Sequence, residues 1–289
     1  MRLALHLNDY SGLGDPHEMA PTLARIARTA EDVGFARLSV TDHLWQISLL
    51  GEENEPMLEA YTTLGFLAGH TRSIELQTLV TAATYRAPGL LGKIVTTLDV
   101  LSRGRAWLGI GLGWNEQEAT GLGLTYDYQP VRYAKLTEAI EIVQQMWSGS
   151  TESYRGPYHQ LSSTLNVPAP LSTPHPRILV GGGGERMTLK IAAKYADAFN
   201  VFGGRDAGQK IVRLREHCER IGRDHTEIEK TALLPLAVDG PGGVERLVEE
   251  LRRLHETGFT TVYGAVAGVG TITPLETIGT KVIPEIAGW

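Results

Sequence analysis

Residues 177–202 read RILVGGGGERMTLKIAAKYADAFNVF and contain a complete strand–helix–strand unit. The apolar run from Arg177 to Gly181 leads into four consecutive glycines, a helix-like stretch follows from Glu185 to Tyr195, and a second apolar run spans Ala198 to Phe202. Two parallel strands joined by a helix are the unit from which α/β folds are built. This stretch therefore predicts a parallel sheet that is covered by helices.

The same alternation recurs about eight times along the chain. Eight such units predict a closed (β/α)8 TIM barrel with insertion loops, and we expect residues 1–289 to form one domain. The seventh strand fits least well, because Pro235 has no N–H to donate, and we expect a bulge there. The predicted strands are Leu3–Asn8, Arg37–Thr41, Ile74–Thr81, Ala106–Gly111, Arg177–Gly181, Ala198–Phe202, Thr231–Val238 and Thr260–Ala265.

Composition and charge narrow the class of protein. The net charge is −6 and the Lys and Arg residues are scattered, so we expect no nucleic-acid partner. No apolar run reaches membrane-spanning length, and a strand-like run begins at Leu3, so we expect no signal peptide. Cys218 is the only cysteine, as expected of a structural thiol in a reducing compartment. We predict a cytoplasmic protein without membrane association.

Gly181 to Gly184 are the first candidate for ligand binding. Glycines between a strand and a helix expose backbone N–H groups at the positive end of the helix dipole, and no Cβ keeps a phosphate away. A tight turn without a ligand explains the glycines equally well. Polar residues at other strand ends favour the phosphate site, because TIM barrels build their sites from the loops that follow the strands.

Two strand ends carry such polar residues. His6 and Asn8 alternate with leucines and would face the barrel axis, although a buried histidine that is paired for structural reasons fits as well. Asp42 and His43 end the second strand, where His43 could exchange a proton with a ligand. The alternative is a capping aspartate beside an exposed histidine. One histidine with one carboxylate offers few metal ligands, so we predict no metal site.

Alternate glycines in the segment 109–113 mark a place where another group approaches the backbone. A planar ring across the barrel mouth would be one such group, with Asn115 bonded to its edge and Trp114 as a wall of the pocket. Two long connections, Trp45–Met57 and Ser148–Pro176, are expected to cover and shape this pocket.

Six segments, in this order along the chain, carry a resemblance to a known superfamily: Thr41–His43, Tyr85–Pro88, Lys93–Gly104, Gly111–Glu116, Arg132–Trp147 and Gly181–Glu185. They resemble the luciferase-like flavin and deazaflavin oxidoreductases, whose barrels include bacterial luciferase. Within that superfamily, the chain looks like the branch that uses coenzyme F420, a 5-deazaflavin.

The resemblance implies roles for individual residues. Thr78 and Leu79 match a non-prolyl cis peptide behind the deazaflavin ring. The F420-dependent sugar-phosphate dehydrogenases carry a proton-transferring glutamate where Trp114 stands here, which leaves His43 as the predicted proton carrier and His6 as the second candidate. The residues matched to cofactor contacts are Asp42, His43, Thr78, Leu79, Thr81, Asn115, Gly181, Gly182, Gly183 and Gly184.

The implied reaction is hydride transfer between C5 of F420 and a small organic substrate. Either reduction of an activated C=C or C=N bond or oxidation of an alcohol fits these residues. The alternative is an FMN-dependent two-component monooxygenase of the same fold, because FMN and F420 share the ring and phosphate sites. A non-catalytic flavin-binding protein is a third reading, which the completeness of the eight units disfavours. Relatives are commonly dimers, so we expect a homodimer.

Overall fold

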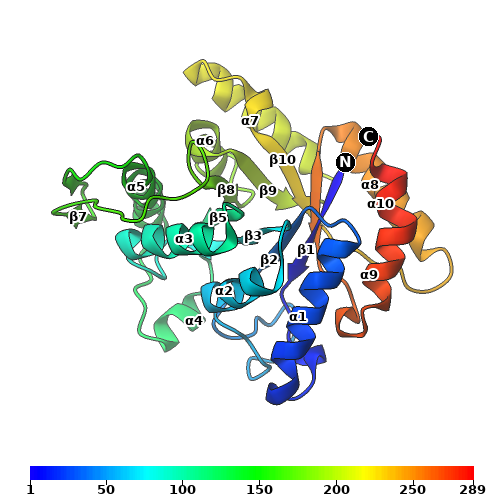
Figure 1. Cartoon of the computed structure of the whole chain (residues 1–289). Helices are drawn as coiled ribbons and strands as arrows, with labels where there is room; N and C mark the ends of the chain where they lie inside the picture. Colours follow the sequence, from blue (N-terminus) through cyan, green and yellow to red (C-terminus); the bar gives the residue numbers. More distant parts are fainter.

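The computed structural model describes residues 1–289 as a closed ring of parallel strands with helices on its outside (Figure 1). Each strand of the ring pairs in parallel with both neighbours, and the pairings of β3 with β5 and of β1 with β11 close it. The ring consists of β1 (Arg2–Leu7), β2 (Arg37–Val40), β3 (Glu75–Thr78), β5 (Ala106–Gly111), β8 (Arg177–Gly181), β9 (Ala198–Phe202), β10 (Glu229–Leu233) and β11 (Thr261–Gly264). The predicted TIM barrel is confirmed.

Ten helices surround the ring. Local sequence sets several of their ends: Asp15 accepts a hydrogen bond at the start of the first helix, and Pro88 begins the third. The helices are α1 (Pro16–Asp32), α2 (Ala60–His70), α3 (Pro88–Ser102), α4 (Glu116–Gly121), α5 (Gln129–Trp147), α6 (Thr188–Tyr195), α7 (Ala207–Ile221), α8 (Gly243–Thr257), α9 (Thr273–Thr277) and α10 (Ile283–Ile286).

The parallel ring gives the barrel two different ends. At the N-terminal end the buried guanidinium of Arg37 pairs with Glu75 and Glu229 and lies over the Trp107 ring. The chain ends also meet, since the Met1 ammonium donates to the carbonyl of Ile286 at 2.9 Å (Figure 1). The C-terminal ends of all eight strands, which we call the rim, are left to the loops that carry the predicted site residues.

A bulge at Leu79–Val80 separates β3 from the short strand β4 (Thr81–Ala82). Its peptide bond is cis, so the cis bond predicted at Thr78–Leu79 lies one residue later. The reason is that the Leu79 N–H still donates to Val40 and continues the ladder with β2.

The alternate glycines of β5 make room for this bulge. A Cβ on Gly111 would lie 2.8 Å from the Val80 side chain, and one on Gly109 would lie 1.9 Å from the Thr78 carbonyl oxygen. Gly181 on β8 faces Val80 in the same way, at 2.8 Å. The group that approaches these glycines is therefore the chain itself, and the predicted planar ring is not needed to explain them.

Two predicted boundaries differ most from the structure. The seventh strand, β10, ends at Leu233, before Pro235, which has no N–H to donate, although Leu234 and Leu236 still donate to the carbonyls of Tyr263 and Ala265. The helix expected from Glu185 begins only at Thr188.

The connection Ser148–Pro176 does not cover the rim, as we had expected. It leads from a helix to a strand and therefore starts and ends at the opposite end of the barrel. Its short hairpin of β6 (Tyr154–Arg155) and β7 (Gln160–Leu161) is tied to the outside of α5, where Glu138 accepts hydrogen bonds from the backbone of Tyr158 and His159. Asp99 on α3 anchors its end by accepting from Leu171 and Ser172.

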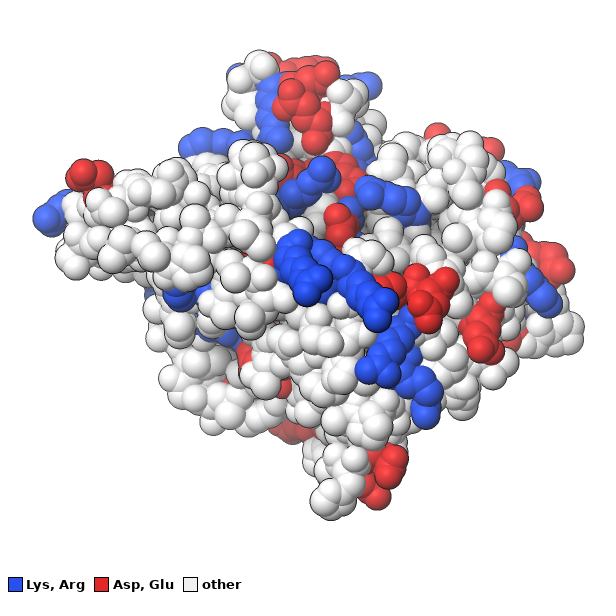
Figure 2. Space-filling view, viewed as in Figure 1, with Lys and Arg blue, Asp and Glu red and all other residues white.

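Acidic and basic side chains are mixed over the surface that Figure 2 presents, where Lys and Arg form a narrow band beside acidic groups. No helix has both the length and the apolar character needed to cross a bilayer.

We predict that Gly111→Ala lowers the free energy of unfolding by about 1–3 kcal/mol, because the added Cβ overpacks the contact with Val80. Urea denaturation measures the loss, and Gly204→Ala is the matched control because its Cβ would meet nothing within 4 Å. When Val80 is also replaced by alanine, Gly111→Ala should cost less unfolding free energy than it does in the parent protein. Gly109→Ala should cost as much as before, because its Cβ meets a backbone oxygen. Equal recovery at both glycines would contradict this packing.

Candidate functional site

His43 is held at the rim by a buried carboxylate. Its Nδ1 lies 2.8 Å from Oε2 of Glu118, the Tyr85 hydroxyl donates to the same oxygen at 2.6 Å, and Oε1 accepts from the backbone of Leu44 and Trp45. Burial acts to raise the pKa of Glu118, but the hydrogen bonds from His43, Tyr85 and Leu44 outweigh it and hold that pKa below its ordinary value. Because a carboxylate only accepts, Nδ1 of His43 carries a hydrogen and Nε2 is left for a ligand.

Asp42 points to a different partner. Its carboxylate is buried and makes a two-pronged pair with Arg86, at 2.6 and 3.0 Å, and Arg86 also pairs with Glu59. This pair links the end of β2 to the loop that follows β4. Asp42 therefore does not cap a helix, which was the alternative considered for it.

Thr78 and Thr81 hold the bulge. The Thr78 hydroxyl donates to the Gly109 carbonyl at 2.8 Å, Thr81 donates to Thr78, and the Tyr61 hydroxyl lies 2.7 Å from Thr81. Both threonines are fully buried, and Leu79 is nearly so. The predicted contacts of these residues with a cofactor ring stay a prediction. The structure shows that the two threonine hydroxyls stabilise the bulge.

Asn115 and Trp114 lie where β5 leads into α4. Asn115 accepts from the Glu118 N–H at 3.2 Å and so caps α4, while its predicted contact with a ring edge stays a prediction. The Trp114 ring is half-exposed and meets the His43 ring edge-on, with centroids 5.5 Å apart. Trp114 is therefore placed beside the candidate catalytic histidine.

The glycines after β8 include free backbone donors. Gly182 donates to Asn200, but the N–H groups of Gly183 and Gly184 have no acceptor within the protein. A Cβ on Gly184 would come within 2.9 Å of Thr188 and Tyr133 side chains, so glycine is required there. Lys210 on α7 lies above this stretch: its Cε would be 3.8 Å from a Cβ on Gly183, and its ammonium pairs with Glu185 at 2.7 Å.

His6 lies inside the rim with one nitrogen committed to the barrel. Its Nδ1 is 3.0 Å from the Ser39 oxygen, and Ser39 donates its one hydrogen to the Leu5 carbonyl. Nδ1 must therefore donate to Ser39, which leaves Nε2 as an acceptor. Burial, with a smaller contribution from the charge of nearby His43, lowers the pKa of His6 to about 4 against the opposing effect of the Ser39 bond, so the ring is neutral at pH 7.

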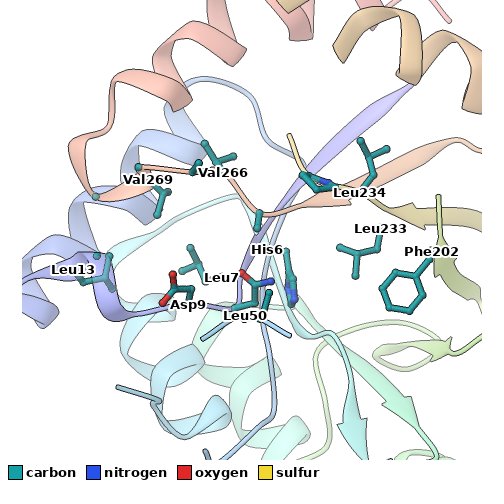
Figure 3. Close-up of a pocket in the computed structure, with 17 residues that line it drawn as sticks. His6, Leu7, Asp9, Leu13, Leu50, Phe202, Leu233, Leu234, Val266 and Val269 are labelled. Atoms are coloured by element: carbon teal, nitrogen blue, oxygen red, sulfur yellow. The ribbon is translucent and has the colours of Figure 1, made fainter. Parts of the chain in front are cut away.

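A cavity of about 440 Å³ opens beside His6, between the rim ends of β1, β9, β10 and β11. Figure 3 shows His6 between Leu7, Asp9 and Leu50 on one side and Leu233 and Phe202 on the other. Leu50 belongs to the connection Trp45–Met57, which therefore shapes the cavity as predicted. We call this space the rim cavity.

Sequence reasoning missed two residues of this site. Glu118 stands 75 positions from His43, and the fold brings them together. Lys210 lies in a polar helix, and its sequence gives no sign that it reaches back over the glycines of β8.

Comparison with known proteins adds a family. A family model described as luciferase-like monooxygenase matches residues 5–255. The chain belongs to this family. The superfamily predicted from the six sequence segments is confirmed.

Two curated members of the family illustrate what the chain is similar to. An F420-dependent glucose-6-phosphate dehydrogenase of Microbacterium testaceum is 30% identical over 207 residues, which cover 69% of this chain and 59% of that protein. An F420-dependent hydroxymycolic acid dehydrogenase of Mycobacterium tuberculosis is 31% identical over 227 residues, covering 75% and 60%. The matched part thus spans about three fifths of these relatives' length. Both are F420-dependent, as the predicted branch would have it.

A solved structure supports the fold alone. The monooxygenase RslO1 of Streptomyces bottropensis is similar with a TM-score of 0.82, and the match covers 98% of this chain and 99% of that one. At 17% sequence identity, this likeness carries no argument about the reaction.

We predict that His6 makes the protein less stable in acid. The folded-state pKa lies below the ordinary value of 6.5, so the unfolded chain binds the proton more readily; stability is full above pH 6.5 and falls as the pH drops towards 4. The fall assigned to His6 is roughly 3 kcal/mol over this window, from 1.36 kcal/mol per pKa unit. Denaturant titrations at several pH values should show a flatter profile for His6→Asn, whereas the exposed His17→Asn should keep the parent's slope. The same slope in both variants would contradict the assignment.

Proposed function

We propose that this protein is an F420-dependent oxidoreductase that transfers a hydride between the deazaflavin and a small organic substrate. The proposal rests on one arrangement. His43, oriented by Glu118, lies on the same rim as the free backbone N–H groups of Gly183 and Gly184. The F420-dependent names of two relatives about 30% identical to the chain support the choice of cofactor.

The residues present fit such a cofactor. Two unpaired N–H groups beside a lysine are the donor set that a phosphate requires, and charge-assisted bonds of this kind are the strong ones. When bound, F420 would supply a carbon that accepts or donates a hydride. Val80 and the backbone around it offer a rigid back wall, because the glycines of β5 and β8 fix them.

The chain's own residues would position the reactants and move the proton. Glu118 holds Nδ1 of the His43 ring and leaves Nε2 free, which would donate to or accept from the reacting oxygen of a substrate. Trp114 stands beside that ring and would limit the access of water. His6, being neutral with Nε2 unprotonated, acts at neutral pH as an acceptor, which leaves His43 as the proton carrier.

The competing function is an FMN-dependent monooxygenase. The family description favours it, since the family model is that of luciferase-like monooxygenases. FMN would use the same phosphate site, so the two proposals differ in the cofactor that binds more tightly and in whether turnover consumes oxygen.

Fluorescence titration of the purified protein with F420 and with FMN is the experiment that separates them. We expect F420 to bind in the micromolar range or tighter, with FMN much weaker. Lys210→Ala should weaken F420 binding by about tenfold through loss of a charge-assisted bond, and Lys190→Ala, an exposed cation on α6, should leave it unchanged. A preference for FMN with oxygen uptake would overturn the proposal in favour of the monooxygenase.

We predict that Glu118→Gln lowers kcat by roughly 10²-fold, because an amide cannot accept from both His43 and Tyr85 while also serving the backbone donors. F420 affinity should change little, since Glu118 is no part of the proposed phosphate site at Gly183, Gly184 and Lys210. Steady-state kinetics and F420 titration measure the two effects, and Glu116→Gln, an exposed neighbour on α4, is the control. A parallel loss of F420 affinity and kcat would contradict a positioning role.

A further inference from the structure

The rim cavity has one polar edge and one apolar wall. The polar edge is the end of β1 and the residues after it, where His6, Asn8 and Asp9 lie on either side of Leu7 in the sequence. The opposite wall comes from β9, β10 and the loop after β11, with Phe202, Leu233 and Val266 among its side chains (Figure 3). A concave, mostly apolar space with few polar groups is typical of small-molecule sites.

The charge of the lining is unusual for a site that would hold a phosphorylated substrate. Asp9 is the only charged side chain of the lining, and neither lysine nor arginine belongs to it. Arg25 lies near the cavity, but its guanidinium donates to the Gly270 carbonyl. An anion in this space would face one carboxylate and no cation, and burying an unpaired charge is costly.

One polar atom of the lining, on the buried His6 ring, is an acceptor. His6 donates through Nδ1 to Ser39, and its Nε2 has no partner in the protein. Burial keeps the pKa of His6 low, so the ring stays neutral at pH 7. A ligand that offers a hydroxyl hydrogen satisfies this atom, whereas a ketone or ether oxygen does not.

We propose that the rim cavity binds an uncharged, largely apolar substrate whose hydroxyl group donates to Nε2 of His6, and that it excludes phosphorylated substrates. This inference rests on the proposed function, since it names the substrate class of the same site. It separates the chain from a sugar-phosphate dehydrogenase such as its relative from Microbacterium testaceum.

Saturation-transfer NMR with three probes tests this substrate class, on the protein with and without F420. The probes are borneol, its ketone camphor, and glucose 6-phosphate. Borneol should bind, and camphor should bind about two- to tenfold more weakly, as expected for one lost hydrogen bond. Glucose 6-phosphate should not compete with borneol.

Two variants assign the binding to the cavity. In His6→Leu the borneol affinity should fall to that of camphor, with camphor unchanged. Phe202 is 79% exposed, so Phe202→Ala should fold and should weaken both probes, whereas Leu101→Ala, exposed on α3, should change neither.

Three results would overturn the inference: no borneol binding, competition by glucose 6-phosphate, or a borneol–camphor difference that persists in His6→Leu. Failure of F420 to bind is a separate result that contradicts the proposed function, because the titrations without F420 still report on the cavity.

Discussion

The rim of this barrel depends on one buried carboxylate. Glu118 accepts hydrogen bonds from His43, from Tyr85 and from the backbone of Leu44 and Trp45, and so joins the ends of β2 and β4 to α4. An ionised carboxylate in this position is tolerated only because every one of these donors is present. Removal of one donor leaves the carboxylate charge less well compensated and so weakens the attachment of the remaining donors. The ends of β2 and β4 and the helix α4 are therefore coupled.

A second constraint lies below this one. Val80 and the Thr78 carbonyl occupy the space that Gly109, Gly111 and Gly181 leave open, which fixes the bulge between β3 and β4 against two neighbouring strands. The two constraints divide the rim. One side, over the bulge and the β8 glycines, has free backbone N–H groups and a histidine fixed by a carboxylate, and the other side is the apolar cavity beside His6. A cofactor and a substrate need these two different environments.

Much of the fold follows from the sequence, because alternation of strand and helix is a local property. Three strands have the predicted bounds: Ala106–Gly111, Arg177–Gly181 and Ala198–Phe202. The other five differ at one or both ends, most of all the strand that was expected to run through Pro235. The polar residues at the strand ends were predicted from the same alternation, and their roles stay a prediction. Glu118 and Lys210 were not found, since contacts over 75 and about 27 positions are set by tertiary packing. The connection Ser148–Pro176 was wrongly expected to cover the rim. Its length suggested a cover, but a connection from a helix to a strand lies at the opposite end of the barrel.

The measurement that tests the account most directly is a crystal structure of the protein with F420 bound. The account predicts the phosphate on the N–H groups of Gly183 and Gly184 within reach of Lys210, and the deazaflavin ring between the Val80 bulge and His43. Electron density for the phosphate elsewhere, or a ring out of reach of His43, would contradict it.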